Sequence, residues 1–317
     1  MLCQTTPLAQ ESLLHIQGPD SLTFLQGQTT CDTRTLDPDH AVPGAYCTPQ
    51  GRVVCDFLLS QLEEDHYALR MRRDIVASSS AIFGKYIIFS KAQLDAGRDD
   101  WQVQACWGPD ARQILHDIFG SAPGERFAAS HGTGFVLVQV DHDGQQFECY
   151  HNNSCTAQLQ QLAATAALAT ESQWQALQLH SGIGRVEAAT VEAFIPQMLN
   201  YDLTGHINFN KGCYTGQEVV ARLHYRGKSK RRMHLAELAT EHPALAGTAL
   251  YSSSSEQSVG NIVNSAADAE GRVMALAVTT QTGLDNGLHL GAVDGPTLSP
   301  RELPYSLDAD QALTDRR

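Results

Sequence analysis

The order of strand-like and helix-like segments between residues 53 and 150 constrains the fold more than any other feature of the sequence. Two β-rich runs come first, separated by a short acidic turn, and a helix, a strand, a second helix and a hairpin follow. These segments are Val53–Leu62, His66–Arg72, a helix from Asp74 to about Lys91, Trp101–Trp107, Pro109–Phe119, and a hairpin of Phe135–Val140 with Gln145–Tyr150. The order ββαβαββ is typical of an antiparallel sheet with helices on one face, so we expect a ferredoxin-like arrangement.

The flanking segments extend this pattern to an α+β protein. A strand at Leu13–Ile16 precedes Gly18–Ser21, which supplies a turn and an N-cap for a helix that carries Phe24. Residues 156–183 are expected to be helical. Three short strand candidates near the C-terminus, separated by Gly- and Ser-containing turns, are typical of a small β-barrel. They are Arg232–Leu238, Val259–Asn264 and Val273–Val278.

Length and hydropathy indicate a soluble, multidomain protein. The 317 residues suffice for two or three domains, each with its own core. The longest apolar stretches fall far below the roughly 20 residues that span a bilayer. The first seven residues have neither the basic flank nor the apolar run of a secretory signal. We therefore expect a cytoplasmic protein without a membrane segment.

The charge distribution is uneven. The net charge of -13, from 22 basic and 35 acidic residues, disfavours general binding to nucleic acids because an acidic surface repels phosphates. One local exception is a basic run of six residues, namely Arg222, Arg226, Lys228, Lys230, Arg231 and Arg232. Such a run is either a solvated face or a site for an anionic group, and its position directly after the motif described below favours the second interpretation.

The eight cysteines predict neither a disulfide framework nor a metal site. They stand at positions 3, 31, 47, 55, 106, 149, 155 and 213, with no Cys-x-x-Cys pair and no regular Cys/His spacing. In a reducing compartment we expect all except Cys213 to be small, buried, unpaired hydrophobes. An iron–sulfur cluster held wholly by this chain is disfavoured for the same reason.

The segment Lys211-Gly212-Cys213-Tyr214-Thr215-Gly216-Gln217-Glu218 is the richest motif in the chain. Its two glycines permit a tight turn with a close approach of the backbone to a ligand. Gln217 and Glu218 then open a helix, and a carboxylate suits the positive end of that helix. The helix N-terminus and Lys211 both favour a thiolate at Cys213, which makes this residue a candidate reactive thiol. A buried turn cysteine is the alternative.

Together with Phe194–Gln197 before it and Val219–Arg222 after it, this motif resembles the signature of the YgfZ-type folate-binding proteins. These proteins are relatives of the glycine-cleavage T-protein, an aminomethyltransferase. The resemblance continues through Phe24–Asp32, Gly51-Arg52, Trp174, Ala176-Leu177, Arg226-Gly227, Lys230-Arg231 and Leu303–Leu307, and so spans nearly the whole chain. It implies three domains around a central channel. These would be a discontinuous N-terminal α+β domain of residues 1–50 plus 151–225, a ferredoxin-like middle domain of 51–150, and a C-terminal β-barrel of 226–317.

The resemblance also implies that the channel holds tetrahydrofolate or a derivative. The implied cofactor-binding residues are Trp174, Gln197, Tyr214, Gln217, Glu218, Arg222 and Arg226. Trp174 would be an aromatic platform for the pterin, and Gln197 and Glu218 would bond its edge. Arg222 or Arg226 would pair with the carboxylates of the folate tail. For Trp174 and Tyr214 a packing role, and for the arginines a surface role, remain open alternatives.

Other polar residues are weaker candidates. The T-protein carries paired aspartates where this chain has Cys55 followed by a single Asp56, which puts aminomethyl transfer in doubt. Asp56 therefore stays a catalytic candidate beside Cys213 and Lys211. Asp32 is expected to cap or brace its turn, and His206 to be a structural hydrogen-bonding group rather than a base for the thiol.

The resemblance implies an accessory role rather than that of a classical enzyme. Such a protein would support the assembly, maintenance or repair of [4Fe-4S] enzymes, including those that methylthiolate tRNA. Its partners would be iron–sulfur enzymes or cluster-assembly proteins, tRNA modification would be affected indirectly, and the protein would be a monomer. Three alternatives remain: a folate-dependent one-carbon (aminomethyl) transferase, direct RNA binding through the basic run, and an interaction scaffold without a ligand.

Overall fold

The computed structural model describes residues 2–227, 229–253 and 255–307, so Lys228 of the basic run lies outside the described residues. The expected α+β class is confirmed, because the described chain combines helices with two open sheets and a closed barrel. It divides into two compact units, Met1–Gly44 with Asp56–Glu171 and Ala45–Cys55 with Ser172–Arg317. The three-domain division around a channel stays a prediction.

The first unit contains the two open sheets. One has the strand order β11-β1-β7-β10-β9-β8, and the other has the order β3-β4-β5-β2-β6. The strands are β1 (Gln4–Pro7), β2 (Glu11–Gln17), β3 (Val42–Cys47), β4 (Val53–Glu63), β5 (His66–Arg72), β6 (Gln93–Asp95), β7 (Gln102–Trp107), β8 (Ala129–Gly132), β9 (Phe135–Gln139), β10 (Gln146–His151) and β11 (Ala167–Leu168). The turn between β3 and β4 belongs to the second unit.

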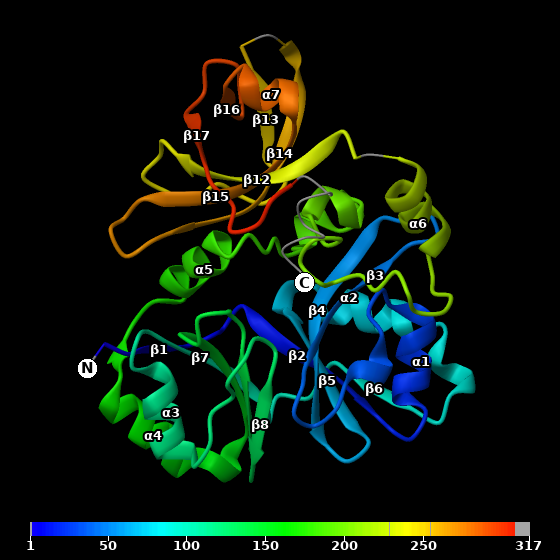
Figure 1. The fold of residues 1–317 in the computed structure, drawn as a ribbon, viewed down its shortest axis with the longest axis vertical. Coiled ribbons are helices and arrows are strands. Elements are labelled where there is room, and N and C mark those ends of the chain that lie inside the picture. Colours follow the sequence, from blue (N-terminus) through cyan, green and yellow to red (C-terminus); the bar gives the residue numbers. More distant parts are fainter. Residues whose placement is uncertain (1, 228, 254, 308–317) are drawn as a thin grey trace. The chain divides into compact units, whose positions relative to one another are not determined.

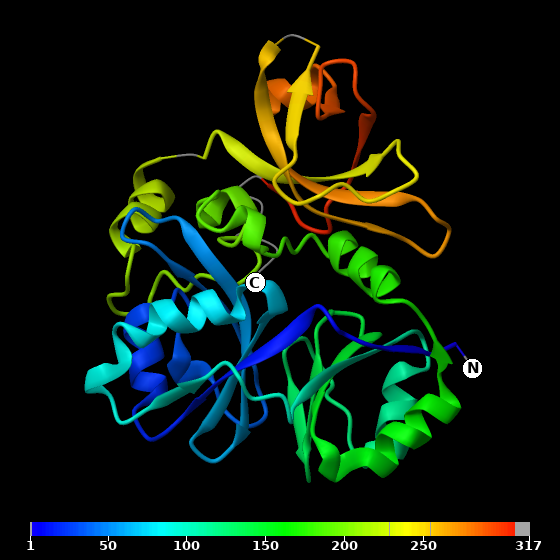
Figure 2. The same ribbon diagram turned by 180° about the vertical axis from the view of Figure 1, so that it is seen from behind.

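Helices cover one face of each open sheet. The α-helices of this unit are α1 (Ser21–Gln28), α2 (Arg73–Gly84), α3 (Ala111–Phe119) and α4 (Thr156–Thr165), with 3-10 turns η1 (Thr33–Thr35), η2 (Ile87–Phe89) and η3 (Asn153–Cys155). Figures 1 and 2 show α3 and α4 side by side against the six-stranded sheet. The core beneath them includes Leu115, Phe147 and Leu162. Four cysteines share this core, and the sulfurs of Cys3 and Cys106 lie 3.3 Å apart without a disulfide.

The single antiparallel sheet expected for residues 51–150 is wrong. Strands β4 and β5 lie in the five-stranded sheet, whereas β7 to β10 lie in the six-stranded sheet. The reason is long-range pairing with the N-terminal strands: Leu14 of β2 lies opposite Leu69 of β5, and Thr5 of β1 lies opposite Cys106 of β7. The first helix is also shorter than expected, since α2 ends at Gly84 rather than near Lys91.

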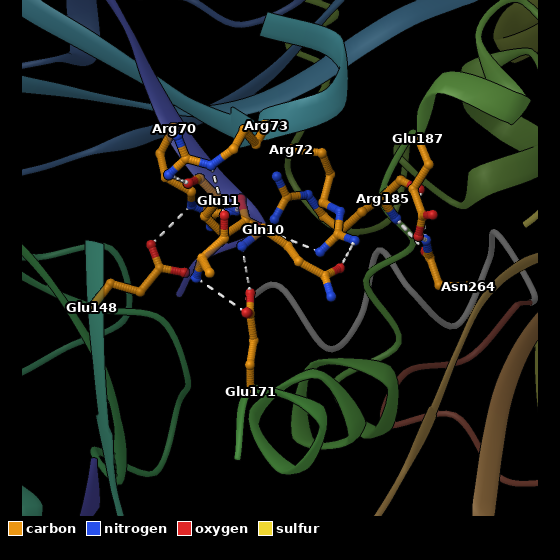
Figure 3. A network of polar contacts seen from close by, with 11 residues as sticks. Gln10, Glu11, Arg70, Arg72, Arg73, Glu148, Glu171, Arg185, Glu187 and Asn264 are labelled. Atoms are coloured by element: carbon orange, nitrogen blue, oxygen red, sulfur yellow. Dashed lines mark hydrogen bonds and ion pairs between the residues drawn. The ribbon is translucent and has the colours of Figure 1, made fainter. Parts of the chain in front are cut away.

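A buried ionic network joins the two sheets of the first unit (Figure 3). Arg70 of β5 donates from Nε to Glu148 of β10 at 2.9 Å, and its Nη1 lies 3.5 Å from Glu11 of β2. The hydroxyl of Tyr150 donates to the same Glu148 carboxylate at 2.8 Å. Glu171 accepts the backbone N–H groups of residues 9 and 10. Because Arg70 and both of its carboxylate partners are buried, these charges are stabilised by one another and not by water.

The second unit contains the predicted barrel. Its closed order is β12-β15-β14-β13-β16-β17. The strands are β12 (Arg231–Leu238), β13 (Ala249–Ser252), β14 (Ser255–Ala267), β15 (Val273–Thr280), β16 (Leu288–Leu290) and β17 (Thr297–Arg301). The strands expected from the sequence correspond to β12, β14 and β15, whereas the three shorter strands that close the barrel were not expected. Small and branched apolar side chains such as Ala236, Ile262 and Ala275 fill its interior.

Helices and turns lead into this barrel. The second unit also includes α5 (Glu171–His180), α6 (Gln217–Arg226) and α7 (Gln281–Asp285), with 3-10 turns η4 (Ala188–Thr190) and η5 (Pro196–Leu199). Asn264 of β14 holds the segment before η4 (Figure 3). Its Oδ1 accepts the Arg185 backbone N–H at 2.7 Å, and its Nδ2 donates to the Arg185 carbonyl and to Glu187. These hydrogen bonds attach the first residues of the irregular segment 181–216 to strand β14 of the barrel.

Candidate functional site

The motif forms a turn that packs against a second turn of the same unit. Gly216, at φ 83°, precedes α6, and a Cβ at this position would lie 2.4 Å from the Thr48 carbonyl oxygen. Gly51, at φ 73°, lies in the β3–β4 turn, where a Cβ would lie 2.9 Å from the Cβ of Val219. Each glycine therefore combines a left-handed backbone with a close approach that a side chain would prevent. The two turns fix the start of α6.

The second glycine of the motif has a different role. An added Cβ at Gly212 would meet no atom within 4 Å, and φ there lies outside the left-handed range. Of the two glycines expected to permit the tight turn, only Gly216 is required by its backbone conformation and its surroundings. The Gly212 backbone borders open space and can be approached from outside.

Cys213 is exposed, whereas the other seven cysteines are buried. The burial expected for those seven is confirmed, and burial raises the pKa of thiols such as Cys47 and Cys149. The alternative of a buried turn cysteine at position 213 is thus wrong. Cys213 stands four residues before α6, and the carboxylate of Glu218 lies in the first turn of that helix, as expected. A role for this thiol in chemistry stays a prediction.

Lys211 and Tyr214, on either side of the thiol in the sequence, are buried and face each other. The Nζ atom of Lys211 lies 5.2 Å from the centroid of the Tyr214 ring, a cation–π distance. Burial raises the pKa of the Tyr214 hydroxyl, and the nearby Cys47 thiol contributes to the rise. Both side chains hold the turn from its inner side, so they position the exposed residue between them.

Gln197 of η5 connects the motif helix to the barrel entry. Its Nε2 donates to the Val220 carbonyl of α6 at 2.8 Å, and its own carbonyl accepts from Arg232 at 2.7 Å. The side chain is 2% exposed, and its Oε1 has no hydrogen-bond partner among the described residues. A buried acceptor without a partner is costly, unless a further donor reaches it.

The basic run separates into two kinds of residue. Arg222 and Arg226 are exposed on α6, one helical turn apart, as a tail-binding role would require. Arg232 instead forms a bidentate pair with Asp202, with N–O distances of 2.7 and 2.9 Å. Arg232 is therefore a structural residue, and the interpretation of the whole run as an anion site is wrong at this position.

Several other sequence candidates lie in packing positions. Trp174 of α5 is 3% exposed, so other side chains already cover its ring, and its role as a pterin platform stays a prediction. Asp56 of β4 is 1% exposed and likewise stays a prediction. His206 is buried, stacks on Tyr201 and bonds Thr204 at 2.8 Å, which confirms a structural role. Gln217 is half-buried at the first position of α6.

Asp32 is confirmed as a local brace. Its carboxylate accepts from the backbone N–H of Arg34 and pairs with the Arg34 guanidinium at 2.7 Å. Hydrogen bonding to that guanidinium lowers the pKa of Asp32 to about 2.

Two features of this region were missed from the sequence. Asn200, at φ 58° and fully buried, donates to the Met233 carbonyl at 2.8 Å, and its Oδ1 has no partner in the described part of the chain. A left-handed asparagine is difficult to recognise without the surrounding turn. The second feature is a group of three aromatic rings, formed by Phe209 with His224 and Tyr225 of α6. The position of His224 and Tyr225 between Arg222 and Arg226 was the available signal.

Within the described ranges, no cluster of three or more His, Cys, Asp or Glu side chains could hold a metal ion. Every helix in the same ranges is too short or too polar to span a bilayer.

Curated relatives match the chain over most of its length. A tRNA-modifying protein YgfZ of Sodalis glossinidius is 30% identical over 300 residues, which cover 93% of this chain and 91% of the relative. The chain belongs to the YgfZ family. A YgfZ of Escherichia coli O157:H7 is also 30% identical, over 94% of this chain and 91% of the relative.

The fold of this YgfZ-family chain is that of the T-protein. Residues 8–134 match the family model of the GCVT N-terminal domain. The crystal structure of the glycine cleavage system aminomethyltransferase T from Bartonella henselae superposes with a TM-score of 0.76, at 16% identity, over 96% of this chain and 86% of that protein. At this identity the likeness shows a shared fold and not a shared activity.

The site in this YgfZ-family chain offers three chemical capacities. The exposed thiol of Cys213 can act as a nucleophile or a soft ligand when it is deprotonated. Gln197 offers a buried acceptor, and Arg222 with Arg226 offers exposed positive charge. All four residues belong to the second unit.

Proposed function

We propose that this protein binds tetrahydrofolate or a derivative in the cytoplasm and supports the assembly, maintenance or repair of [4Fe-4S] enzymes. The enzymes served would include those that methylthiolate tRNA, so tRNA modification would depend on the protein indirectly. Membership in a family whose curated relatives are named tRNA-modifying proteins supports the link to tRNA. The partners would be iron–sulfur enzymes or cluster-assembly proteins.

The observation that carries the proposal is the selective exposure of Cys213. Seven of the eight cysteines are buried, which blocks access to their thiols, and burial raises the pKa of thiols such as Cys47 and Cys149. Cys213 instead lies on a turn that is held by Lys211 and Tyr214 from within and by the Gly216–Gly51 contact at its end. A thiol fixed in this way can approach a reactive centre of a partner.

Three features support folate as the ligand. Pterin rings carry N–H donors, and the Oε1 atom of Gln197 is a buried acceptor that such a donor would satisfy. The glutamate tail of folate carries carboxylates, which Arg222 and Arg226 would pair with. The open space beside Gly212 leaves backbone accessible to a flat ligand.

Equilibrium dialysis with tetrahydrofolate tests the ligand directly. Replacing both arginines, as in Arg222→Gln with Arg226→Gln, should weaken binding about tenfold or more, because two charge-assisted contacts are lost. The matched control is Lys85→Gln with Lys91→Gln, which removes two exposed lysines from the other unit and should leave binding unchanged. Absence of saturable binding to the unaltered protein would refute the folate assignment.

A host assay tests the thiol. A Cys213→Ala variant should retain folate binding but lower the level of methylthiolated tRNA and the activity of [4Fe-4S] enzymes. Cys213→Ser, which preserves size and polarity but not thiolate chemistry, should fail equally. Full tRNA methylthiolation in either variant would show that the thiol has no such role.

A further inference from the structure

Two aromatic rings of the motif helix α6 form an ordered group with a third ring that precedes the helix in the sequence. The rings of Phe209 and His224 stack with centroids 3.7 Å apart at an interplanar angle of 12°. Tyr225 meets both edge-on, at 6.2 Å from Phe209 and 4.8 Å from His224. Tyr225 is nevertheless 65% exposed. The two edge-on contacts orient the Tyr225 ring while most of its surface stays open to a partner.

Unpaired cations stand before and after His224 and Tyr225 in the sequence. The side chains of Arg222, Arg226, Lys230 and Arg231 make no hydrogen bond or ion pair with another described residue. The segment from residue 222 to residue 232 contains six of the chain's 22 basic residues and no acidic one. In a protein of net charge -13, this concentration produces a local positive field that an anionic partner would experience.

We propose that an aromatic–basic surface, made of Phe209, His224, Tyr225, Lys230 and Arg231, binds a short stretch of single-stranded RNA. Exposed aromatic rings stack on unpaired bases, and neighbouring cations pair with the phosphates between them. Lys230 stands five positions after Tyr225, so the chain between them spans at most about 18 Å, the length of a few nucleotides. The choice of RNA over DNA rests on the proposed function.

The arrangement fits a nucleic acid better than an acidic polypeptide. An acidic polypeptide would use the cations but has no use for a solvated ring supported by a stacked pair. Double-stranded RNA would reach the cations, but its bases are already stacked on one another. The surface therefore predicts a preference for unpaired strands that depends on both ring and charge.

The binding test uses the whole protein, without folate, and a fluorescent single-stranded RNA of about twelve nucleotides. Tyr225→Ala should weaken the affinity at least about fivefold, the loss of one base–aromatic stack, while Tyr225→Phe should retain it. A duplex of the same sequence should bind more weakly. Because the ring is exposed, these variants are expected to fold as the parent does.

The salt dependence tests the cations. The double variant Lys230→Gln with Arg231→Gln should make the slope of log K against log salt less negative by about 1.4, at 0.7 for each phosphate contact. The control Lys85→Gln with Lys91→Gln removes the same charge elsewhere and should leave the slope unchanged.

Three results would overturn the proposal: no binding at about 50 mM salt, a Tyr225→Ala variant that binds as the parent does, or displacement of the RNA by polyglutamate at equal concentration. Failure of the folate dialysis would leave this test intact, since the RNA assay contains no folate.

Discussion

Replacing Gly216 by alanine should destabilise the motif turn more than any other single glycine substitution in it. The left-handed backbone alone costs alanine about 1 kcal/mol. In addition, the new Cβ would lie 2.4 Å from the Thr48 carbonyl oxygen, a backbone atom that cannot rotate away. Overpacking of this kind adds about 1 to 3 kcal/mol. The expected loss is therefore about 2 to 4 kcal/mol at the start of α6.

Hydrogen exchange of the amides in α6 measures this loss locally. A loss of 2 kcal/mol corresponds to exchange about 30-fold faster. Two controls separate the causes: Gly120→Ala has the same left-handed backbone, at φ 82°, but no neighbour within 4 Å, and Gly212→Ala has neither constraint. Gly120→Ala should therefore cost about 1 kcal/mol at the end of α3, and Gly212→Ala almost nothing. If Gly216→Ala cost no more than Gly120→Ala, the close contact with the β3–β4 turn would not exist in solution.

Three further perturbations test the rest of the structure. Burial lowers the pKa of His15 to about 4 from 6.5, so its contribution to stability is present above pH 6.5 and is lost as the pH falls towards 4. Because burial also lowers the pKa of His151 to about 4, urea unfolding should show a decrease of at least about 3 kcal/mol across that window, and a flat profile would refute it. Glu148→Gln breaks the buried pair with Arg70 and should destabilise the first unit by about 3 kcal/mol, measured by thermal unfolding; an unchanged Tm would contradict this. Asp202→Asn removes the bidentate partner of Arg232 and should cost about 1 to 2 kcal/mol in the same assay, whereas no loss would mean that the pair is solvated.

Sequence signals predicted those elements well that are determined by residues close to one another in the chain. The hairpin of β4 and β5 forms across the polar turn expected for it, and α6 starts at Gln217, directly after the glycine that forces the turn. The short strand candidates that became β12, β14 and β15, separated by Gly- and Ser-containing turns, indicated the barrel. For Cys213 the motif left both a reactive and a buried thiol open, and the structure shows it exposed.

Long-range pairing could not be predicted from the same signals. Which sheet a strand joins depends on partners far along the chain, such as β2 for β5, and no local pattern specifies them. For the same reason the pairing of Asp202 with Arg232, thirty residues apart, could not be predicted. The structural Arg232 was therefore grouped with the exposed arginines of the basic run. The empty space beside Gly212 could not be predicted either, because a glycine in the sequence does not reveal what surrounds its Cα.

The rate of alkylation of Cys213, with and without saturating tetrahydrofolate, tests the proposed site most directly. Quantitative mass spectrometry of the peptide that contains Cys213 gives this rate, and the buried Cys149 and Cys155 serve as internal references. If the folate lies against the motif turn, the ligand should slow labelling of Cys213 at least about tenfold and leave the reference cysteines unreactive. Labelling of Cys213 at the same rate in saturating tetrahydrofolate would contradict the placement of the thiol beside the ligand.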